Sequence, residues 1–230
     1  MHLGDIRAGY TCRMTSSNST PPRSGRLPLT LVLIAALAAG LGLWAGQKAF
    51  FGNASLPETQ TMRLLSPARV LPDFSLQSVG GSRIDASMLH GRWTMVFLGF
   101  THCPDVCPMT LAELAKAEKL LADVPDAQRP RILFVSVDPE RDTPDIIAKY
   151  AAYFSPTVLT GTSDVDALTR FASSLSMVFA KSPLADGDYT IDHTSWVAVL
   201  NPQAQLAGFI RPPLEPEKIA ADLRLLLEHH

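Results

Sequence analysis

Residues 93–117 read WTMVFLGFTHCPDVCPMTLAELAKA and combine three features in one run. Trp93–Phe100 is a continuous apolar run of strand length, which is typical of a strand buried on both faces. Pro108–Ala122 places Leu111, Leu114, Ala117 and Leu121 on one helical face and predicts an amphipathic helix. Between them lies a short loop that contains Cys103 and Cys107. The run therefore predicts a buried strand, a cysteine loop and a helix.

The flanking segments alternate between strand and helix patterns. Leu71–Asp85 predicts a hairpin around its glycine pair, and Arg131–Val137 predicts a second buried strand. Further predicted elements are a helix after Asp142-Thr143-Pro144, a helix over Asp164–Ser173, a hairpin of Ser195–Leu200 with Gln205–Ile210, and a helix from Pro216. A strand that runs into a cysteine pair and then a helix predicts an α/β, thioredoxin-like fold with an N-terminal hairpin.

The composition is that of one globular domain with additional segments. The chain has 230 residues, 47% hydrophobic and 18% charged, which is ample for a sizeable core. Residues 49–230 carry 15 Lys and Arg against 21 Asp and Glu. Because nucleic-acid binding needs a basic surface, this acidic body argues against a nucleic acid as the partner.

The N-terminal part predicts a membrane anchor. Residues 1–26 are polar, basic and rich in Ser, Thr and Pro, so we expect a disordered tail. Residues 27–46 contain no charged side chain, and twenty helical residues span about 30 Å, the thickness of a bilayer core. The apolar region of a cleaved signal peptide is shorter, about 7–15 residues. A single retained transmembrane helix is therefore favoured over a cleaved leader.

Charges around this apolar run predict its orientation. Arg23 and Arg26 precede it, so the positive-inside rule places the N-terminus in the cytoplasm and the main domain outside. Residues 47–69 mix Gly, Asn, Pro and Ser and predict a linker. Residues 70–230 are then the predicted globular domain.

The cysteine loop predicts thiol chemistry. Three cysteines are too few for a disulfide scaffold, and Cys12 lies in the predicted tail. Pro108 suits the first turn of the helix, which puts Cys107 at the helix N-terminus, where free N–H groups stabilise a thiolate. Thiolates bind soft metals. Dithiol oxidoreductases typically have two residues between their cysteines, whereas Cys103 and Cys107 have three. This spacing favours a metal site and leaves a redox pair as the alternative.

A histidine is expected to complete the site. His193 precedes a predicted strand, and in the thioredoxin topology this junction faces the cysteine loop. His102 adjoins Cys103, but neighbours on an extended backbone point to opposite faces, which predicts a packing or supporting role. The remaining histidines fall in the tail, in a turn and at the C-terminal end: His2, His90, His229 and His230. The predicted ligands are therefore Cys103, Cys107 and His193.

These donors suit copper, as Cu(I) through the thiolates and as Cu(II) with the imidazole added. Zinc accepts the same donors, so ligand type leaves both metals open. Asp138 follows the second buried strand and is expected near the cysteine loop, where it would support a metal ligand. The adjoining Glu140, Arg141 and Asp142 are expected to form a capped turn with solvated charges.

Three motifs together resemble the Sco/SenC family: Gly99–Pro108 (GFTHCPDVCP), Ser136–Thr143 (SVDPERDT) and Asp188–His193 (DYTIDH). The N-terminal anchor also fits that family. The resemblance implies a thioredoxin-like protein that binds copper through the residues matching Cys103, Cys107 and His193. It implies a metallochaperone for the copper centre of cytochrome c oxidase, with subunit II as partner and other copper chaperones as further partners.

Resemblance and topology together imply a domain in a bacterial periplasm or in the mitochondrial intermembrane space. The absence of an obvious Arg-rich presequence favours a periplasmic domain tethered to a bacterial inner membrane. The main alternative function is a thiol–disulfide reductase that acts through Cys103 and Cys107 on the cysteines of subunit II. A weaker alternative is peroxide sensing or reduction by the thiolates. Ser182–Gly187 predicts a flexible insert that lets His193 approach or leave the metal.

Overall fold

The computed structural model describes residues 28–50, 57–185 and 187–229. The chain forms two compact units, Met1–Ala54 and Ser55–His230. The first unit contains α1 (Leu29–Phe50), in which Leu29–Gly46 has the length and apolar composition of a membrane span. The helix thus begins and ends a few residues later than the predicted 27–46. The predicted tail, residues 1–26, lies outside the described residues.

A six-stranded sheet in the order β1-β10-β9-β4-β5-β6 is the centre of the second unit. The predicted buried strands are confirmed as β4 (Thr94–Gly99) and β5 (Arg131–Ser136), which pair in parallel. All six side chains of β4 are buried. On its other side β4 pairs antiparallel with β9 (Val197–Leu200), which pairs in turn with β10 (Leu206–Ile210), and these two strands confirm the predicted hairpin.

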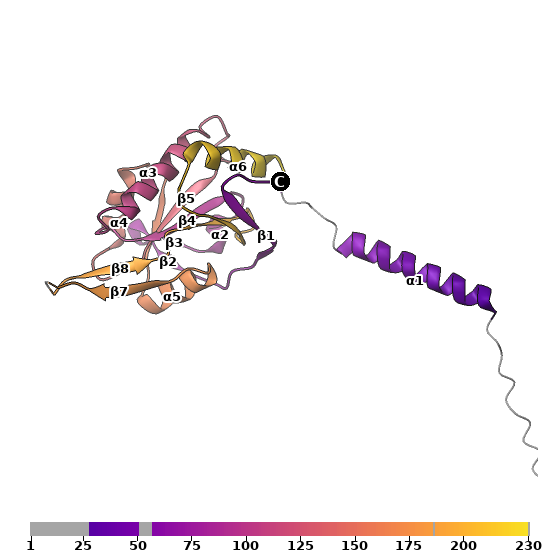
Figure 1. Ribbon diagram of the computed structural model, residues 1–230. Helices are drawn as coiled ribbons and strands as arrows, with labels where there is room; N and C mark the ends of the chain where they lie inside the picture. The colour runs from indigo at the N-terminus through magenta and orange to yellow at the C-terminus, as the bar shows by residue number, and fades with distance from the viewer. Residues whose placement is uncertain (1–27, 51–56, 186, 230) are drawn as a thin grey trace, which may run out of the picture. The chain divides into compact units, whose positions relative to one another are not determined.

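Helices cover both faces of this sheet. Figure 1 shows α3 (Val106–Lys119) and α6 (Pro216–Glu228) together on one face, with α2 (Ala86–Leu89) and α5 (Val165–Ser174) on the other. Along the chain, α4 (Pro144–Ala152) connects β5 to β6 (Leu159–Gly161). A parallel β4–α3–β5 unit, an antiparallel pair and a final helix make the thioredoxin-like arrangement that the sequence predicts.

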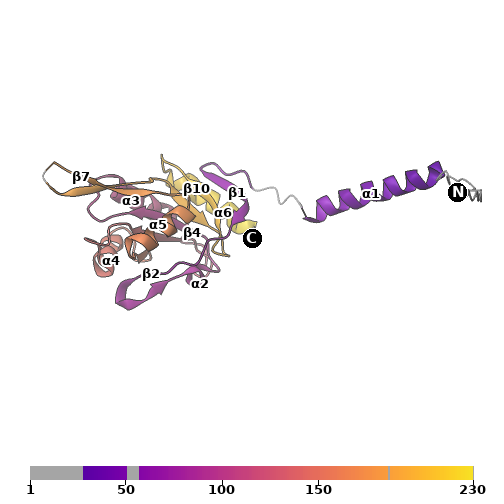
Figure 2. The same cartoon turned by 90° about the horizontal axis from the view of Figure 1, so that it is seen from below.

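Two short hairpins lie outside this sheet. The predicted N-terminal hairpin is confirmed as β2 (Leu76–Gln77) and β3 (Arg83–Ile84), joined by a turn whose glycines have positive φ angles. A second hairpin of β7 (Phe179–Pro183) and β8 (Tyr189–His193) was not predicted. It extends beyond the sheet in both views (Figures 1 and 2), and the predicted insert begins within it, since Ser182 and Pro183 belong to β7.

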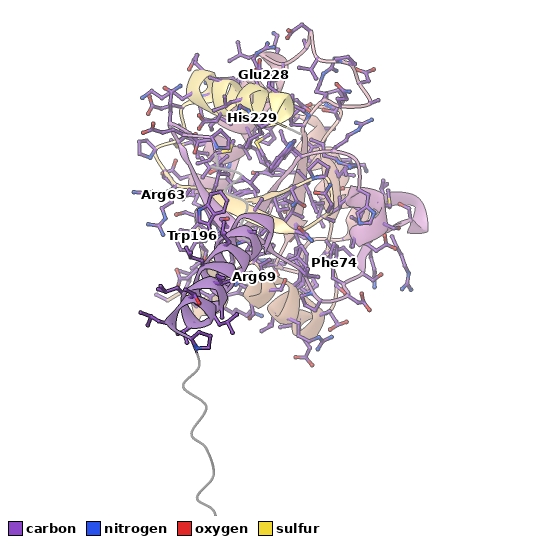
Figure 3. The ribbon with its side chains drawn as sticks, turned by 90° about the vertical axis from the view of Figure 1, so that its right-hand side faces the viewer. Arg63, Arg69, Phe74, Trp196, Glu228 and His229 are labelled. Carbon is purple, nitrogen blue, oxygen red and sulfur yellow. The ribbon has the colours of Figure 1, made fainter. Side chains whose placement is uncertain are left out.

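The domain begins earlier than predicted, because β1 (Met62–Arg69) is an edge strand of the sheet. The prediction of a linker over 47–69 is therefore wrong for these eight residues. Pro67 and the arginines interrupt the alternation that marks a strand, and an edge strand tolerates both. Figure 3 shows this side of the domain, where Arg63 and Arg69 are labelled. β1 approaches β10 closely, since a Cβ on Gly208 would lie 2.6 Å from the Arg63 carbonyl oxygen.

Candidate metal centre

The cysteine loop leaves the carboxyl end of β4 and is held by a buried carboxylate. Asp142 accepts hydrogen bonds from the backbone N–H and the hydroxyl of Thr101, and a third from the hydroxyl of Ser136. The prediction of Asp142 as a solvated charge is wrong, because Asp142 is fully buried, while Thr143 caps α4. The sequence did contain a signal for a different role of Asp142: the adjacent Thr143 is already an adequate helix cap.

Cys107 lies in the first turn of α3 and is fully buried. Its sulfur fills the space beside Gly99, where a Cβ would lie only 2.7 Å from the Cys107 Sγ. The Cys107 backbone N–H points at the half-buried Cys103, with 3.4 Å between the nitrogen and the Cys103 Sγ. The free N–H of the helix N-terminus is thus used by Cys103 rather than by Cys107.

His193 is the last residue of β8, and its ring is fixed in orientation. Its Nδ1 lies 3.1 Å from the Thr194 carbonyl oxygen, which can only accept a hydrogen bond, so Nδ1 carries the proton. The lone pair of Nε2 then faces the Cys107 Sγ at 3.4 Å. The rings of Phe97 and Phe100 lie edge-on to the imidazole, with centroids at 5.8 and 6.1 Å.

The predicted trio converges on one point. One ligand atom each from Cys103, Cys107 and His193 lies within 4.8 Å of the others. Metal–sulfur and metal–nitrogen bonds of about 2.3 and 2.0 Å, the lengths known for zinc, would let one ion touch all three. The arrangement can bind a soft metal or undergo thiol–disulfide exchange.

Burial sets the protonation of the metal-free site. It raises the pKa of the Cys107 thiol, with a further contribution from neighbouring Cys103, and it lowers the pKa of the His193 imidazole. The thiol S–H therefore faces a neutral imidazole nitrogen. The prediction that the helix N-terminus keeps Cys107 as a thiolate is wrong for the metal-free protein, because burial outweighs it. A metal must displace this proton.

The other two predicted neighbours lie further from the trio. His102 is exposed, and its Nδ1 lies 3.2 Å from the Thr101 hydroxyl oxygen, in agreement with its expected turn away from the cysteines. Asp138 is buried but bonds to Arg141 and Tyr189. Among the described residues it makes no hydrogen bond to Cys103, Cys107 or His193. The Asp138 carboxylate bonds to Arg141 and Tyr189, which were not predicted as site residues.

Comparison with known proteins gives consistent results. The family model described as SCO1/SenC matches residues 63–228. A protein of Stutzerimonas stutzeri, named putative copper-binding protein, is 30% identical over 200 residues, which cover 86% of this chain and 94% of the relative. The mitochondrial SCO2 homolog of Mus musculus is 30% identical over 196 residues, covering 84% of this chain and 76% of the relative.

Solved structures resemble the second unit. ScoI of Bradyrhizobium japonicum, solved with copper bound, aligns with a TM-score of 0.62 and 33% identity over 68% of this chain and 98% of its own. The apo Sco1 protein of Thermus thermophilus aligns with a TM-score of 0.65 and 31% identity over 74% of this chain and 98% of its own. Both alignments support the thioredoxin-like fold.

Proposed function

Because the chain belongs to the SCO1/SenC family, we propose that it binds copper and acts in the assembly of cytochrome c oxidase. The observation that carries this proposal is the convergence of two cysteine sulfurs and one imidazole nitrogen within 4.8 Å, at the end of β4. Relatives are named copper-binding or were solved with copper, which supports copper over zinc as the ion.

In this function copper is the ion that is transferred, and each of the three ligands has a different role in binding it. Two thiolates suit Cu(I), and the His193 nitrogen adds a donor that suits Cu(II). Cys107 is buried and anchors the ion, whereas the half-buried Cys103 gives an incoming ligand access to it. Transfer would then proceed by ligand exchange from the Cys103 side.

The recipient that we propose is subunit II of the oxidase, with other copper chaperones as donors. The proposed location is the periplasmic side of a bacterial inner membrane. The supporting features are the apolar helix α1 and the arginines that precede it in the sequence. In this arrangement α1 would keep the copper-binding domain at the membrane that contains the oxidase.

A thiol–disulfide reductase is the second candidate, since Cys103 and Cys107 are both free thiols. Here the Cys103 thiolate would attack a disulfide of the partner, and Cys107 would release the reduced partner as the two cysteines join. Each disulfide reduced takes two electrons and two protons from the pair. The placement of His193 favours the copper function, because its Nε2 lies 3.4 Å from the Cys107 Sγ and thiol–disulfide exchange has no need of an imidazole there.

A fragment of subunit II with its copper-binding cysteines separates the two candidates. We would mix the full-length chain, in detergent and loaded with Cu(I), with the reduced fragment, and the metal-free chain with the oxidised fragment. The copper function predicts metal transfer in the first mixture, and its loss when the chain carries Cys103→Ser. Disulfide reduction in the second mixture, with no transfer in the first, would instead establish the reductase.

A further inference from the structure

Tyr189 is held between two cations. The Arg141 Cζ lies 3.7 Å from the centre of its ring, and the Lys181 Nζ lies 3.6 Å from the same centre. Arg141 belongs to the loop between β5 and α4, Lys181 to β7, and Tyr189 begins β8. Cations against an aromatic ring are attracted by its electron-rich faces. The ring therefore joins the loop to the hairpin.

Hydrogen bonds also join the β5–α4 loop to the β7–β8 hairpin. The Tyr189 hydroxyl donates to one oxygen of Asp138 at 2.8 Å, and the Arg141 Nε donates to the other at 2.6 Å. Arg141 also donates to the Tyr189 carbonyl oxygen at 3.1 Å. Burial and Asp138 raise the pKa of Tyr189 to about 12, so its hydroxyl remains a donor at neutral pH. Asp138, Arg141 and Tyr189 together form a clamp between the loop and the hairpin.

The hairpin needs such support. In the part of the chain that the structure describes, β7 and β8 pair with each other and form a sheet of their own. A two-stranded hairpin is marginally stable in water at best. Figure 2 shows this hairpin reaching beyond the rest of the domain. His193 is at the opposite end of β8 from Tyr189, so the position of its imidazole depends on how the hairpin is held.

The clamp and the cysteine loop share one segment of chain. Asp142 holds the cysteine loop through Thr101, and Arg141, the preceding residue, holds the hairpin through Tyr189. The Arg141 Cζ also lies 5.9 Å from the centre of the Phe100 ring, which in turn lies edge-on to His193. Residues 138–142 thus connect the cysteine half of the metal centre to its histidine half.

We propose that Arg141 and Tyr189 are positioning residues that place the His193 imidazole against the cysteine pair. This inference rests on the proposed copper function. The clamp is expected to matter for Cu(II) binding, in which the His193 imidazole is a ligand. Cu(I) binding by the two sulfurs depends on the clamp much less, since Cys103 lies in the loop that Asp142 holds and Cys107 lies in the first turn of α3.

The test compares Arg141→Gln, Tyr189→Phe and Arg224→Gln in the full-length chain. Arg224 is the matched control, because it also bridges two elements, by an ion pair to Asp123 at 2.6 Å. With Arg141→Gln we expect the nitrogen hyperfine coupling of Cu(II) to weaken toward that of His193→Ala, and Cu(II) affinity to fall about tenfold. Cu(I) affinity should change less than threefold. Tyr189→Phe keeps the ring and should give a smaller loss, and Arg224→Gln should give none.

A second measurement uses the metal-free protein. Amide hydrogen exchange of Asp192, which pairs with Ala180 across the hairpin, should speed up at least tenfold in Arg141→Gln and stay unchanged in Arg224→Gln. Unchanged exchange at Asp192 together with wild-type nitrogen coupling would overturn the clamp. If the unmodified chain takes up no copper, the proposed function fails instead, and the exchange data alone then decide on the clamp.

Discussion

At the scale of single residues, the two cysteines of the metal centre differ in burial. Cys107 is fully buried, with its sulfur beside Gly99 and the His193 Nε2, whereas Cys103 is half-buried and accepts a helix N–H. The same thiol chemistry thus occurs in two environments four residues apart. An ion held at this site has one sheltered ligand and one that a partner can reach.

The buried thiol gives a pH dependence with a definite sign. Because the folded state raises the pKa of Cys107, the unfolded chain loses this proton first, near its ordinary pKa of about 8.5. The stabilisation is complete below that pH and is lost as the pH rises toward the folded pKa. We expect the free energy of unfolding of the metal-free protein to fall by up to about 1.4 kcal/mol per pH unit there.

Urea titrations at pH 7 to 10 measure this dependence, with Cys107→Ala as the control. The difference between the two proteins isolates the Cys107 contribution, because the other titrating groups are common to both. A difference that stays constant across this range would contradict the assignment of a raised pKa.

Gly99 gives a prediction about the space for the sulfur. Gly99→Ala puts a methyl group 2.7 Å from the Cys107 Sγ, so the sulfur or the strand must shift. We expect a loss of about 1–3 kcal/mol of stability, typical of an overpacked core, and an altered Cu(II)–thiolate absorption band. Gly161→Ala is the control, because its new methyl would meet the Leu76 Cβ at 2.9 Å, where no cysteine lies. If both variants leave the band unchanged, the close fit at Gly99 does not shape the metal centre.

At the scale of helices and strands, elements with a strong local sequence pattern were predicted correctly. Features that depend on tertiary contacts, such as an edge strand or a buried carboxylate, were not. The apolar runs gave β4 and β5, and the cysteine spacing with the downstream histidine gave the trio. Strand β1 was missed because Pro67 and its arginines interrupt the alternation, and β6 because it has three residues. The charges of residues 140–142 were interpreted as solvated, since sequence alone does not reveal that the Asp142 carboxylate is buried.

Asp222 in α6 fixes the start of β1. It accepts hydrogen bonds from the backbone N–H groups of Gln60, Thr61 and Met62 and from the Thr61 hydroxyl, and it is buried. Asp222→Asn replaces one acceptor oxygen by a donor and leaves N–H groups unpaired. We expect a loss of about 3 kcal/mol in urea unfolding and faster amide exchange at Met62. Glu217→Gln, on the exposed side of the same helix, should cost a few tenths, and an equal cost in both variants would contradict the role of Asp222.

The molecule as a whole combines one apolar helix with one acidic domain. If α1 anchors the protein with its N-terminus in the cytoplasm, a C-terminal reporter that is active only outside the cytoplasm should be active in a bacterial host. The chain should also remain with membranes after washing at high salt and dissolve in detergent. Activity of a cytoplasm-only reporter at the same position would reverse the proposed orientation.

The proposed function depends above all on one copper ion bound by Cys103, Cys107 and His193, and a count of bound copper decides whether it is held there. The full-length chain in detergent would be loaded anaerobically and desalted, and the copper retained per chain compared with that of Cys103→Ser, Cys107→Ser and His193→Ala. We predict one ion per chain, lost in either cysteine variant and held more weakly, with altered Cu(II) absorption, in His193→Ala. Retention of one copper by both cysteine variants, or none by the unmodified chain, would rule out this three-residue site.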